Sequence, residues 1–503
     1  MADGPQLRPG AGDRPQGGVG RAVAKGVVWS TLGGIGERLI GFLALAVVVR
    51  LMTLEEAGIA MLAASTFDVI LVVSTAGFGE RIIQNPRTDR RLEGTVFWLQ
   101  MAVCGVIAVL FFLAAGPISD LFGEPRVLPL LQVMSVLIVS RAVAVVPAAL
   151  LARSMKYGWL TAGSLLTSLA SAVAGIGIAL AGYPIWALVA QFFASSTVFA
   201  LAVCLVARWL PPLKFSPREA WRTVVFSVPL LGSSLMTALS AQASTLMIGL
   251  SLSVDAVALF RVAARLFEVM GQVLVLPVQR VLLATFSVLR DDQVRAQGAF
   301  LNMLRVLAAV AFAAYALVGA QAHDVMRILF GPRWEPSGGV LMVLVVGVVG
   351  LVARSFVHAS LTAVGRTRLV LAYTAATTLG MVAAVSFAAR YSEVAVAAAQ
   401  SGLLLATVPL SLLAFRIAFA IRPGAALACL PQPLLAALAA AVASSFVASW
   451  VAPFLPHYPA PKVIVAGAAG AVAFAAAHFA LGPRRTRQTV GAVLALLRRR
   501  AGG

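Results

Sequence analysis

The chain has 503 residues, of which 60% are hydrophobic and only 12% are charged. A soluble globule of this composition would expose large apolar patches, so the composition excludes that class and predicts a membrane protein. The net charge of +20 would suit nucleic acid, but no soluble basic domain accompanies it, and we expect no nucleic-acid partner. The three cysteines, Cys104, Cys204 and Cys429, lie far apart in or beside apolar runs, so we predict no disulfide, no metal site and no cofactor.

Long apolar runs, each able to cross the bilayer as a helix, follow one another along the chain. They predict an all-α integral membrane protein with about 14 transmembrane helices, arranged as two pseudo-symmetric six-helix bundles plus two extra C-terminal helices. The predicted spans begin near Val27, Ala57, Thr95, Val127, Trp159, Pro184, Thr223, Ala256, Ala299, Gly338, Leu369, Val394, Pro431 and Lys462. The predicted segments are a tail at 1–26, a bundle at 27–207, a linker at 208–222, a bundle at 223–420, two helices at 421–482 and a basic tail at 483–503.

Lys and Arg are concentrated in alternate connections between these spans. The connections on one side hold 26 of them and those on the other side only 6, namely Arg50, Arg126, Arg327, Arg333, Arg390 and Lys462. Because positively charged loops stay on the cytoplasmic side, we expect both termini in the cytoplasm. The tail from Thr486 to Arg500 alternates apolar and basic residues, and it fits either an interfacial helix on anionic membrane lipids or a solvated basic end.

Two short matches between the halves indicate an internal repeat. The segment Lys25–Ser30 resembles Arg222–Ser227 at the start of the seventh span, and Ala63–Val69 resembles Ala263–Val269 one span later. Six spans separate the two openings, so both halves enter the membrane in the same direction, as parallel repeats do. This symmetry predicts a cavity between the two bundles.

Charged residues near the middle of the predicted spans are the candidate functional groups, because each costs roughly 2.5 to 3.5 kcal/mol to insert and needs a partner or water. They are Glu37, Arg38, Asp68, Arg141, Arg261, Arg265 and Glu268. The last three share one helical face, since they are spaced by four and three residues. We predict that Arg38, Arg141, Arg261 and Arg265 bind an anionic substrate, and that Glu37, Asp68 and Glu268 serve in coupling or ion pairing.

A purely structural role is the alternative interpretation of these polar residues. The acids could simply neutralise the arginines and hold the halves together. The seventh span is rich in polar side chains, which could line a wet wall or join helices: Ser233, Ser234, Thr237, Ser240, Gln242, Ser244 and Thr245. Arg305, Arg354 and His358 lie nearer the predicted inner ends, where long side chains can reach water, and we give them less weight.

Motifs of soluble enzymes are missing from the sequence. There is no phosphate-binding G-x-x-x-x-G-K-[ST] loop and no zinc-binding H-E-x-x-H, and the four histidines are scattered. The outer loops, such as 320–337 and 453–462, are too short for a catalytic domain. We therefore expect a transporter and not an enzyme.

Several segments, in order, resemble the Wzx-type polysaccharide exporters of the multidrug/oligosaccharidyl-lipid/polysaccharide (MOP) superfamily, in the exopolysaccharide and colanic-acid-like branch. They are Trp29-Ser30, Val49–Gly58, Gly77–Gln84, Thr95–Trp98, Ala149–Lys156, Trp186–Gln191, Val281–Ser287 with Asp291-Asp292, and Leu329–Trp334. The likeness covers roughly residues 25–345. The chain departs from the family pattern at Leu54 and Ala57, where the family has Pro and Phe. It departs again at Leu283-Ala284, where the family has F-P, so Pro277 is the candidate replacement for that proline as a hinge.

The resemblance implies two six-helix bundles, a cationic central cavity, alternating access and an undecaprenyl-pyrophosphate-linked repeat unit as substrate. A lipid-linked oligosaccharide is thus the expected substrate, and a polysaccharide polymerase and a chain-length regulator are candidate partners. Two alternatives stay open: a cation-coupled multidrug exporter of the same superfamily, and a membrane-embedded glycosyltransferase or polymerase. A proton, a sodium ion or no ion could couple transport.

Overall fold

A computed structural model describes the chain over residues 16–75, 77–85, 89–154, 157–288, 292–454 and 459–481. The predicted basic tail at 483–503 and most of the predicted N-terminal tail lie outside these residues. The first half of the chain comprises α1 (Gln16–Leu51), α2 (Leu54–Thr75), α3 (Phe78–Gln84), α4 (Arg90–Phe122), α5 (Val127–Arg153), α6 (Tyr157–Leu180), the 3₁₀ turn η1 (Pro184–Trp186) and α7 (Ala187–Ala207).

The second half begins with α8, which starts inside the predicted linker. It comprises α8 (Pro217–Ser251), α9 (Val254–Leu274), α10 (Leu276–Val288), α11 (Gln293–Ala320), α12 (Ala322–Phe330), η2 (Pro332–Trp334), α13 (Ser337–Val346), α14 (Val348–Ala363), α15 (Thr367–Ala388), α16 (Glu393–Ala406) and α17 (Val408–Phe419). Three further helices follow it: α18 (Pro423–Leu427), α19 (Pro431–Val451) and α20 (Pro459–Leu481).

The all-α prediction is confirmed, because the described residues contain helices and no strand. Among the described residues, eleven helices are long and apolar enough to cross a membrane, or twelve if α13 and α14, which are bent by 50° at their junction, form one span. The predicted count of about 14 is not confirmed. It depends on α1 and α9, which are not among the eleven, and α9 carries Arg261, Arg265 and Glu268.

Several predicted spans are interrupted within their length. The helix that begins at Val254 ends at Leu274, and α10 starts directly before Pro277. The helix that begins at Glu393 breaks in the same way at Thr407, two residues before Pro409. Proline lacks the N–H that would continue the helical hydrogen bonds, and this accounts for both breaks. Pro277 therefore lies at a helix break, where a hinge would be expected.

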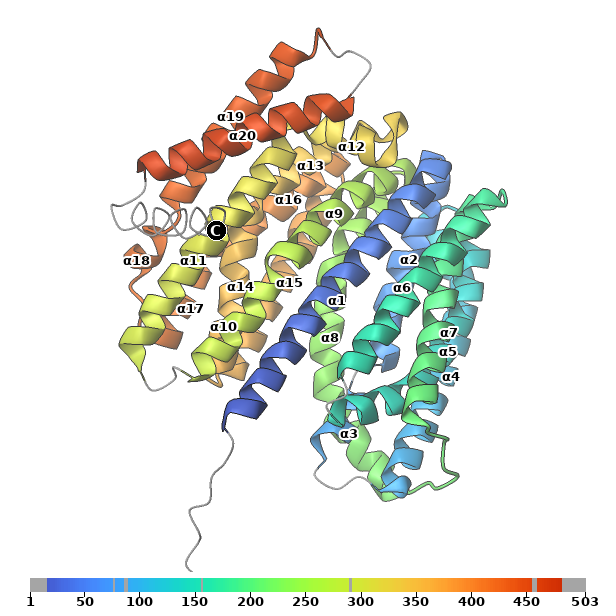
Figure 1. Cartoon of the computed structure of the whole chain (residues 1–503). Helices are drawn as coiled ribbons and strands as arrows, with labels where there is room; N and C mark the ends of the chain where they lie inside the picture. Colours follow the sequence, from blue (N-terminus) through green and yellow to red (C-terminus); the bar gives the residue numbers. More distant parts are fainter. Residues whose placement is uncertain are drawn as a thin grey trace, which may run out of the picture.

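The two halves repeat one packing pattern. In the first half α1 packs against α6, α6 against α7, α4 against α5 and α2 against α5. In the second half α8 packs against α15, α15 against α16, α11 against α14 and α9 against α13. Figure 1 shows α1 running between the two groups of helices, with α19 and α20 packed together at the far edge beside α11. The repeat found in the sequence thus has a counterpart in the packing.

Helices α2 and α9 lie against each other at the junction of the halves. Their starts are equivalent: the Thr53 hydroxyl accepts a hydrogen bond from the Glu56 N–H, and the Ser253 hydroxyl accepts one from the Ala256 N–H. Such caps satisfy backbone donors at a helix start and fix where the helix begins. At Gly58 the two helices approach so closely that a side chain would overlap the Val254 carbonyl. The two halves therefore meet through backbone at this end of the molecule.

The same end carries arginine contacts between the halves. Nε of Arg50, near the end of α1, donates to the Leu329 carbonyl over 2.9 Å, and an Nη of Arg333 donates to the Met52 carbonyl, also over 2.9 Å. We call this end, which contains the α1–α2 connection and α12, the outer end, because the charge distribution predicts that it faces away from the cytoplasm. The opposite end, with α3 and the start of α8, is the inner end.

The segment before Arg126, also at the outer end, repeats the sequence motif before Arg333. Arg126 follows a Leu-Phe-Gly-Glu-Pro segment, as Arg333 follows Leu-Phe-Gly-Pro. Arg126 pairs with Glu124 and with Glu55 at the start of α2. Hydrogen bonds to these two carboxylates raise the pKa of Arg126 above its usual range. Each half thus places an arginine beside the α1–α2 connection.

Candidate functional site

Five of the predicted site residues form one group, which we call the central charged cluster: Asp68, Arg141, Arg261, Arg265 and Glu268. Its core is on α9, where an Nη of Arg261 lies 2.9 Å from one carboxylate oxygen of Glu268. An Nη of Arg265 lies 3.6 Å from the other oxygen. The helical spacing predicted that these three side chains share a face, and the structure places them so.

Asp68 joins α2 to this group. Its Oδ2 accepts a hydrogen bond of 3.1 Å from Nε2 of Gln242 on α8. Its carboxylate is also within electrostatic range of Arg261, Arg141 and Arg265. Asp68 therefore balances part of the positive charge that comes from α5 and α9.

Arg141 enters the cluster from α5. Its Nε donates to the hydroxyl of Ser196 on α7 over 3.2 Å, and its charge interacts with that of Asp68. The cluster thus draws its five charges from α2, α5 and α9, and neutral partners from α7 and α8. Three arginines face two carboxylates, so the cluster carries one excess positive charge.

The exposed surface of the cluster opens between the halves and not to lipid. α9 packs against α1, α2, α8, α11, α13 and α16, so helices of both halves surround it. The described side chains of α2 and α9 include no exposed large hydrophobic residue, whereas α4 exposes seven of them. Yet the Arg265 and Glu268 side chains remain 30% and 34% exposed. Charged groups in this position can be approached by water or by a substrate held between the halves.

Unused polar atoms lie beside the cluster on α8. In the described part of the chain, Oε1 of Gln242 and the Thr245 hydroxyl are buried with no hydrogen-bond partner. Buried polar groups are nearly always satisfied, so these two atoms leave room for water or for a ligand that donates or accepts hydrogen bonds.

The other polar residues of α8 divide between the two interpretations made from the sequence. Ser233 and Thr237 bond to carbonyls of their own helix. The Ser244 hydroxyl instead donates to Oε1 of Gln400 on α16 over 2.9 Å. Part of the α8 polar set therefore joins helices, and only Gln242 contacts the central charged cluster by a hydrogen bond.

Glu37 and Arg38 are not brought into the cluster. Both lie on α1, with Arg38 about 20 Å from the outer end of its helix, a depth similar to that of Asp68 on α2. An Nη of Arg38 donates to the Gly34 carbonyl over 3.0 Å within the same helix, and Glu37 is exposed. Substrate binding by Arg38 and a coupling role for Glu37 remain predictions.

Arg354 is the residue whose position sequence reasoning undervalued. Once the extra η2 turn is allowed for, Val139-Ser-Arg-Ala142 aligns with Val352-Ala-Arg-Ser355, so Arg354 is the second-half counterpart of Arg141. Arg354 lies inside the second half with Tyr373 and His358 as electrostatic neighbours, and it forms no ion pair with a described carboxylate. Extending the internal repeat to the fourth helix of each half would have found it.

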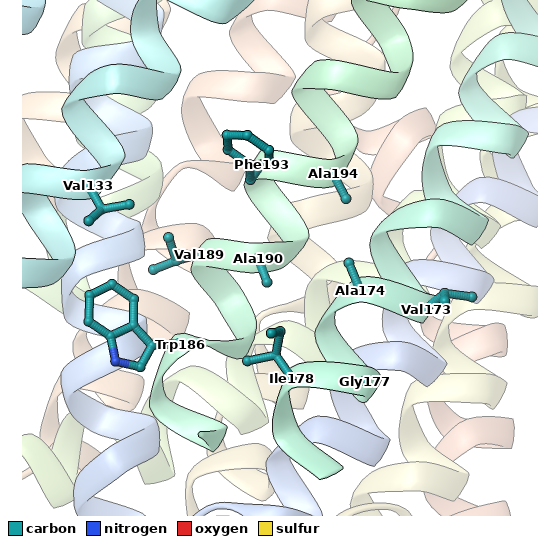
Figure 2. A pocket seen from close by; sticks show the side chains of 10 residues that line it. All are labelled: Val133, Val173, Ala174, Gly177, Ile178, Trp186, Val189, Ala190, Phe193 and Ala194. Atoms are coloured by element: carbon teal, nitrogen blue, oxygen red, sulfur yellow. The ribbon is translucent and has the colours of Figure 1, made fainter. Parts of the chain in front are cut away.

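An apolar cavity of about 530 Å³ lies outside the cluster, in the first half. Figure 2 shows its lining side chains, which come from α5, α6, η1 and α7, with the ring of Trp186 on one side and Ile178 on another. Apart from the ring nitrogen of Trp186, the side chains of its walls are hydrocarbon, and none carries a charge. Such a surface suits a lipid chain and cannot hold a charged headgroup.

The chemistry of the cluster is ion pairing. Arginine donates planar pairs of hydrogen bonds that match the oxygens of phosphate and carboxylate groups. Across the described ranges, no three His, Cys, Asp or Glu side chains lie close enough to hold a metal ion. An anion bound here would compete with Asp68 and Glu268 for the same guanidinium groups.

Comparison with known proteins identifies the family. The sequence pattern of a family described as polysaccharide biosynthesis protein matches residues 47–338, more than half of the chain. The chain belongs to this family. The succinoglycan biosynthesis transport protein ExoT of Rhizobium meliloti (strain 1021) is 27% identical over 328 residues, which cover 64% of this chain and 66% of ExoT. The lipopolysaccharide biosynthesis protein WzxC of Escherichia coli (strain K12) is 23% identical over 337 residues, 65% of this chain and 66% of WzxC. The matches thus span just under two thirds of each relative.

Solved structures show the fold of this member of the family. The lipid II flippase MurJ, in an inward closed conformation, superposes with a TM-score of 0.74 over 90% of this chain and 98% of MurJ, at 12% identity. An inward-facing multidrug resistance MATE family transporter of the MOP superfamily superposes with a TM-score of 0.56, covering 78% and 94% of the two chains at 15% identity. The fold is that of MOP-superfamily transporters, and the resemblance drawn from the sequence is confirmed. The protein is a multi-pass membrane protein whose relatives are named as transport and biosynthesis proteins.

Proposed function

We propose that this protein flips a lipid-linked oligosaccharide repeat unit from the cytoplasmic to the outer leaflet of the bacterial inner membrane, for exopolysaccharide, capsule or O-antigen biosynthesis. The observation that carries the proposal is the central charged cluster, with its excess positive charge between the two halves of a polysaccharide biosynthesis protein. The substrate lipid carries a pyrophosphate, whose oxygens Arg141, Arg261 and Arg265 would bind. Asp68 and Glu268 would pair with the arginines again when the substrate leaves.

Transport would proceed by alternating access. The outer end is held by the close contact at Gly58 and by the hydrogen bonds of Arg50 and Arg333, and the inner end by the ion pair of Arg81 with Glu219, which a substrate entering from the inner side would open. Breaking the outer contacts while the inner pair forms again would turn the cluster outward. Arginine pairs that can exchange partners fit such a cycle.

Orientation and energetics favour outward movement of an anion. With both termini in the cytoplasm, as the distribution of Lys and Arg predicts, the inner end faces the negative side of the membrane. Moving one negative charge outward through that potential is favoured by about 2.3 kcal/mol per 100 mV. A pyrophosphate-linked substrate would gain this energy without a coupled ion, and a polymerase and chain-length regulator at the outer face would be its candidate partners.

Multidrug export is the less favoured alternative. The MATE transporters share the fold, but a cationic drug would be repelled by a cluster in which three arginines face two carboxylates. A glycosyltransferase or polymerase is less favoured because the cluster lies between the halves, away from the outer loops. The named relatives act in polysaccharide biosynthesis, which agrees with an anionic lipid-linked substrate.

The test replaces Arg265 in cells that depend on this protein for polymer export. Arg265→Ala should abolish secreted polymer and leave the lipid-linked repeat unit in the inner leaflet, while the protein reaches the membrane at the normal level. Arg295→Ala is the matched control, because Arg295 is 80% exposed and its ion pair within the described residues is with its neighbour Asp292. Normal export by Arg265→Ala would remove Arg265 from the mechanism, and loss of export by Arg295→Ala would show that the assay reports folding.

A further inference from the structure

A second basic site lies at the inner end, apart from the central charged cluster. It is a cavity of about 820 Å³ between α3 with the start of α4, on one side, and the start of α8 on the other. We call it the inner basic pocket, and its charged lining residues are Arg81, Asp89, Arg91, Arg218, Glu219 and Arg222. Four arginines face two acids, so the pocket has two excess positive charges. Its walls come from both halves of the protein.

Glu219 is the centre of this pocket. Its two carboxylate oxygens are shared, with an Nη of Arg222 at 2.7 Å and an Nη of Arg81 at 3.4 Å. Arg222 is on α8 with Glu219, whereas Arg81 is on α3, so the second pair joins the two halves. The Arg81–Glu219 pair is therefore an inner counterpart of the arginine contacts at the outer end.

Arg81 is held so that part of its guanidinium remains unused. Its charged group lies 5.8 Å from the centre of the Phe226 ring, a cation–π arrangement. Within the part of the chain that the structure describes, its Nε is buried and has no hydrogen-bond partner. A buried donor without a partner is costly, and an oxygen-rich anion could satisfy Nε and Nη together.

The start of α8 adds backbone donors to the pocket. Ser216 occupies the cap position, but its side chain makes no capping hydrogen bond, and Pro217 has no N–H. The N–H groups of the first helical turn therefore depend on Glu219 or on a bound anion for compensation. Helix starts of this kind attract phosphate groups.

We infer that the inner basic pocket is a loading site for the pyrophosphate end of the lipid-linked substrate, on the cytoplasmic side of the membrane. The pyrophosphate takes Arg81 and Arg222 away from Glu219, and this opens the ion pair between the halves. The pocket lies about 35 Å along α8 from Gln242, the residue that contacts Asp68, so it is a separate stage of the path. The inference rests on the proposed function and extends it to how the substrate is first recognised.

Pyrophosphate binding to the purified full-length protein tests the pocket without requiring transport. Titration calorimetry in neutral detergent, in an Arg265→Gln background that weakens the central charged cluster, should show at least tenfold weaker binding in Arg81→Gln/Arg222→Gln. Glu219→Gln should bind several-fold more tightly, because it removes the competing carboxylate, and a gain of affinity cannot come from misfolding. Arg295→Gln, an exposed arginine at the same end, should change nothing. Equal affinity in the double variant, or no gain in Glu219→Gln, would overturn the inference.

Competition by lipids separates the two sources of a phosphate headgroup. Micelles that contain undecaprenyl pyrophosphate should displace inorganic pyrophosphate from the pocket at concentrations at least tenfold lower than micelles of phosphatidylglycerol. Equal displacement would show a general site for anionic phospholipid and would contradict the loading role. If the protein does not have the proposed transport function, the export assay will show this, and the results of these binding experiments will not change.

Discussion

Glu268 holds the two α9 arginines that we assign to substrate binding, so removing its charge should tighten that binding. In Glu268→Gln the carboxylate that lies 2.9 Å from Arg261 and 3.6 Å from Arg265 becomes a neutral amide. The excess charge of the central charged cluster rises from one to two. The side chains are 16% to 34% exposed, and solvent screening limits the pairs to about 1 kcal/mol in total. A substrate that no longer competes with Glu268 should therefore bind about fivefold more tightly.

The assay is equilibrium binding of a fluorescent undecaprenyl-pyrophosphate-linked sugar to purified protein in neutral detergent. Export in cells should fall at the same time, because Arg261 and Arg265 lose the carboxylate that pairs with them again when the substrate is released. Glu55→Gln is the matched control, since Glu55 is an exposed acid that pairs with Arg126 at the outer end. Unchanged or weaker binding in Glu268→Gln, with normal thermal stability, would refute the competition between Glu268 and the substrate.

Three further substitutions test other parts of the structure. Gly58→Ala should lower the free energy of unfolding by about 2 kcal/mol, because the new methyl group overlaps the Val254 carbonyl. Gly105→Ala, which meets no neighbouring atom, should leave the unfolding temperature in detergent almost unchanged, and equal effects of the two would contradict the close contact. Arg333→Gln should speed hydrogen–deuterium exchange in the first turn of α2 and not in α4, whereas protection that stays the same would show that this arginine does not close the outer end. Arg354→Leu should keep or raise the unfolding temperature, since an unpaired charge is removed, yet reduce export; a protein that exports normally would give Arg354 no part in transport.

The sequence predicted the helices and most of the cluster for the same reason, which is the cost of polar groups in lipid. Apolar runs must form helices, and the predicted starts at Val127 and Pro431 agree with α5 and α19 to the residue. The charges of α9 share a face by helical spacing alone. The meeting of Asp68 with α9 followed from the internal repeat, which aligns Asp68 with Glu268.

Other features depend on tertiary contacts that have no local signal. The rotation of α1, and with it the position of Arg38, is set where Gly33 packs tightly against Thr161 of α6. The bend between α13 and α14 at Gly347 lies where α16 packs closely against this junction. A Cβ atom added at Gly347 would lie 3.0 Å from Cδ1 of Leu404. The ion pair of Arg81 with Glu219 joins segments that are distant in sequence, so neither partner could be chosen from the sequence alone.

The most direct test of substrate binding by the central charged cluster is a structure of the protein with an undecaprenyl-pyrophosphate-linked sugar, determined by cryo-electron microscopy in a lipid nanodisc. We predict phosphate density between α2, α5 and α9, within hydrogen-bonding distance of Arg265 and of Arg141 or Arg261. Phosphates found only against the lipid-facing surface, with the five charged side chains still paired among themselves, would contradict the proposed role of the cluster.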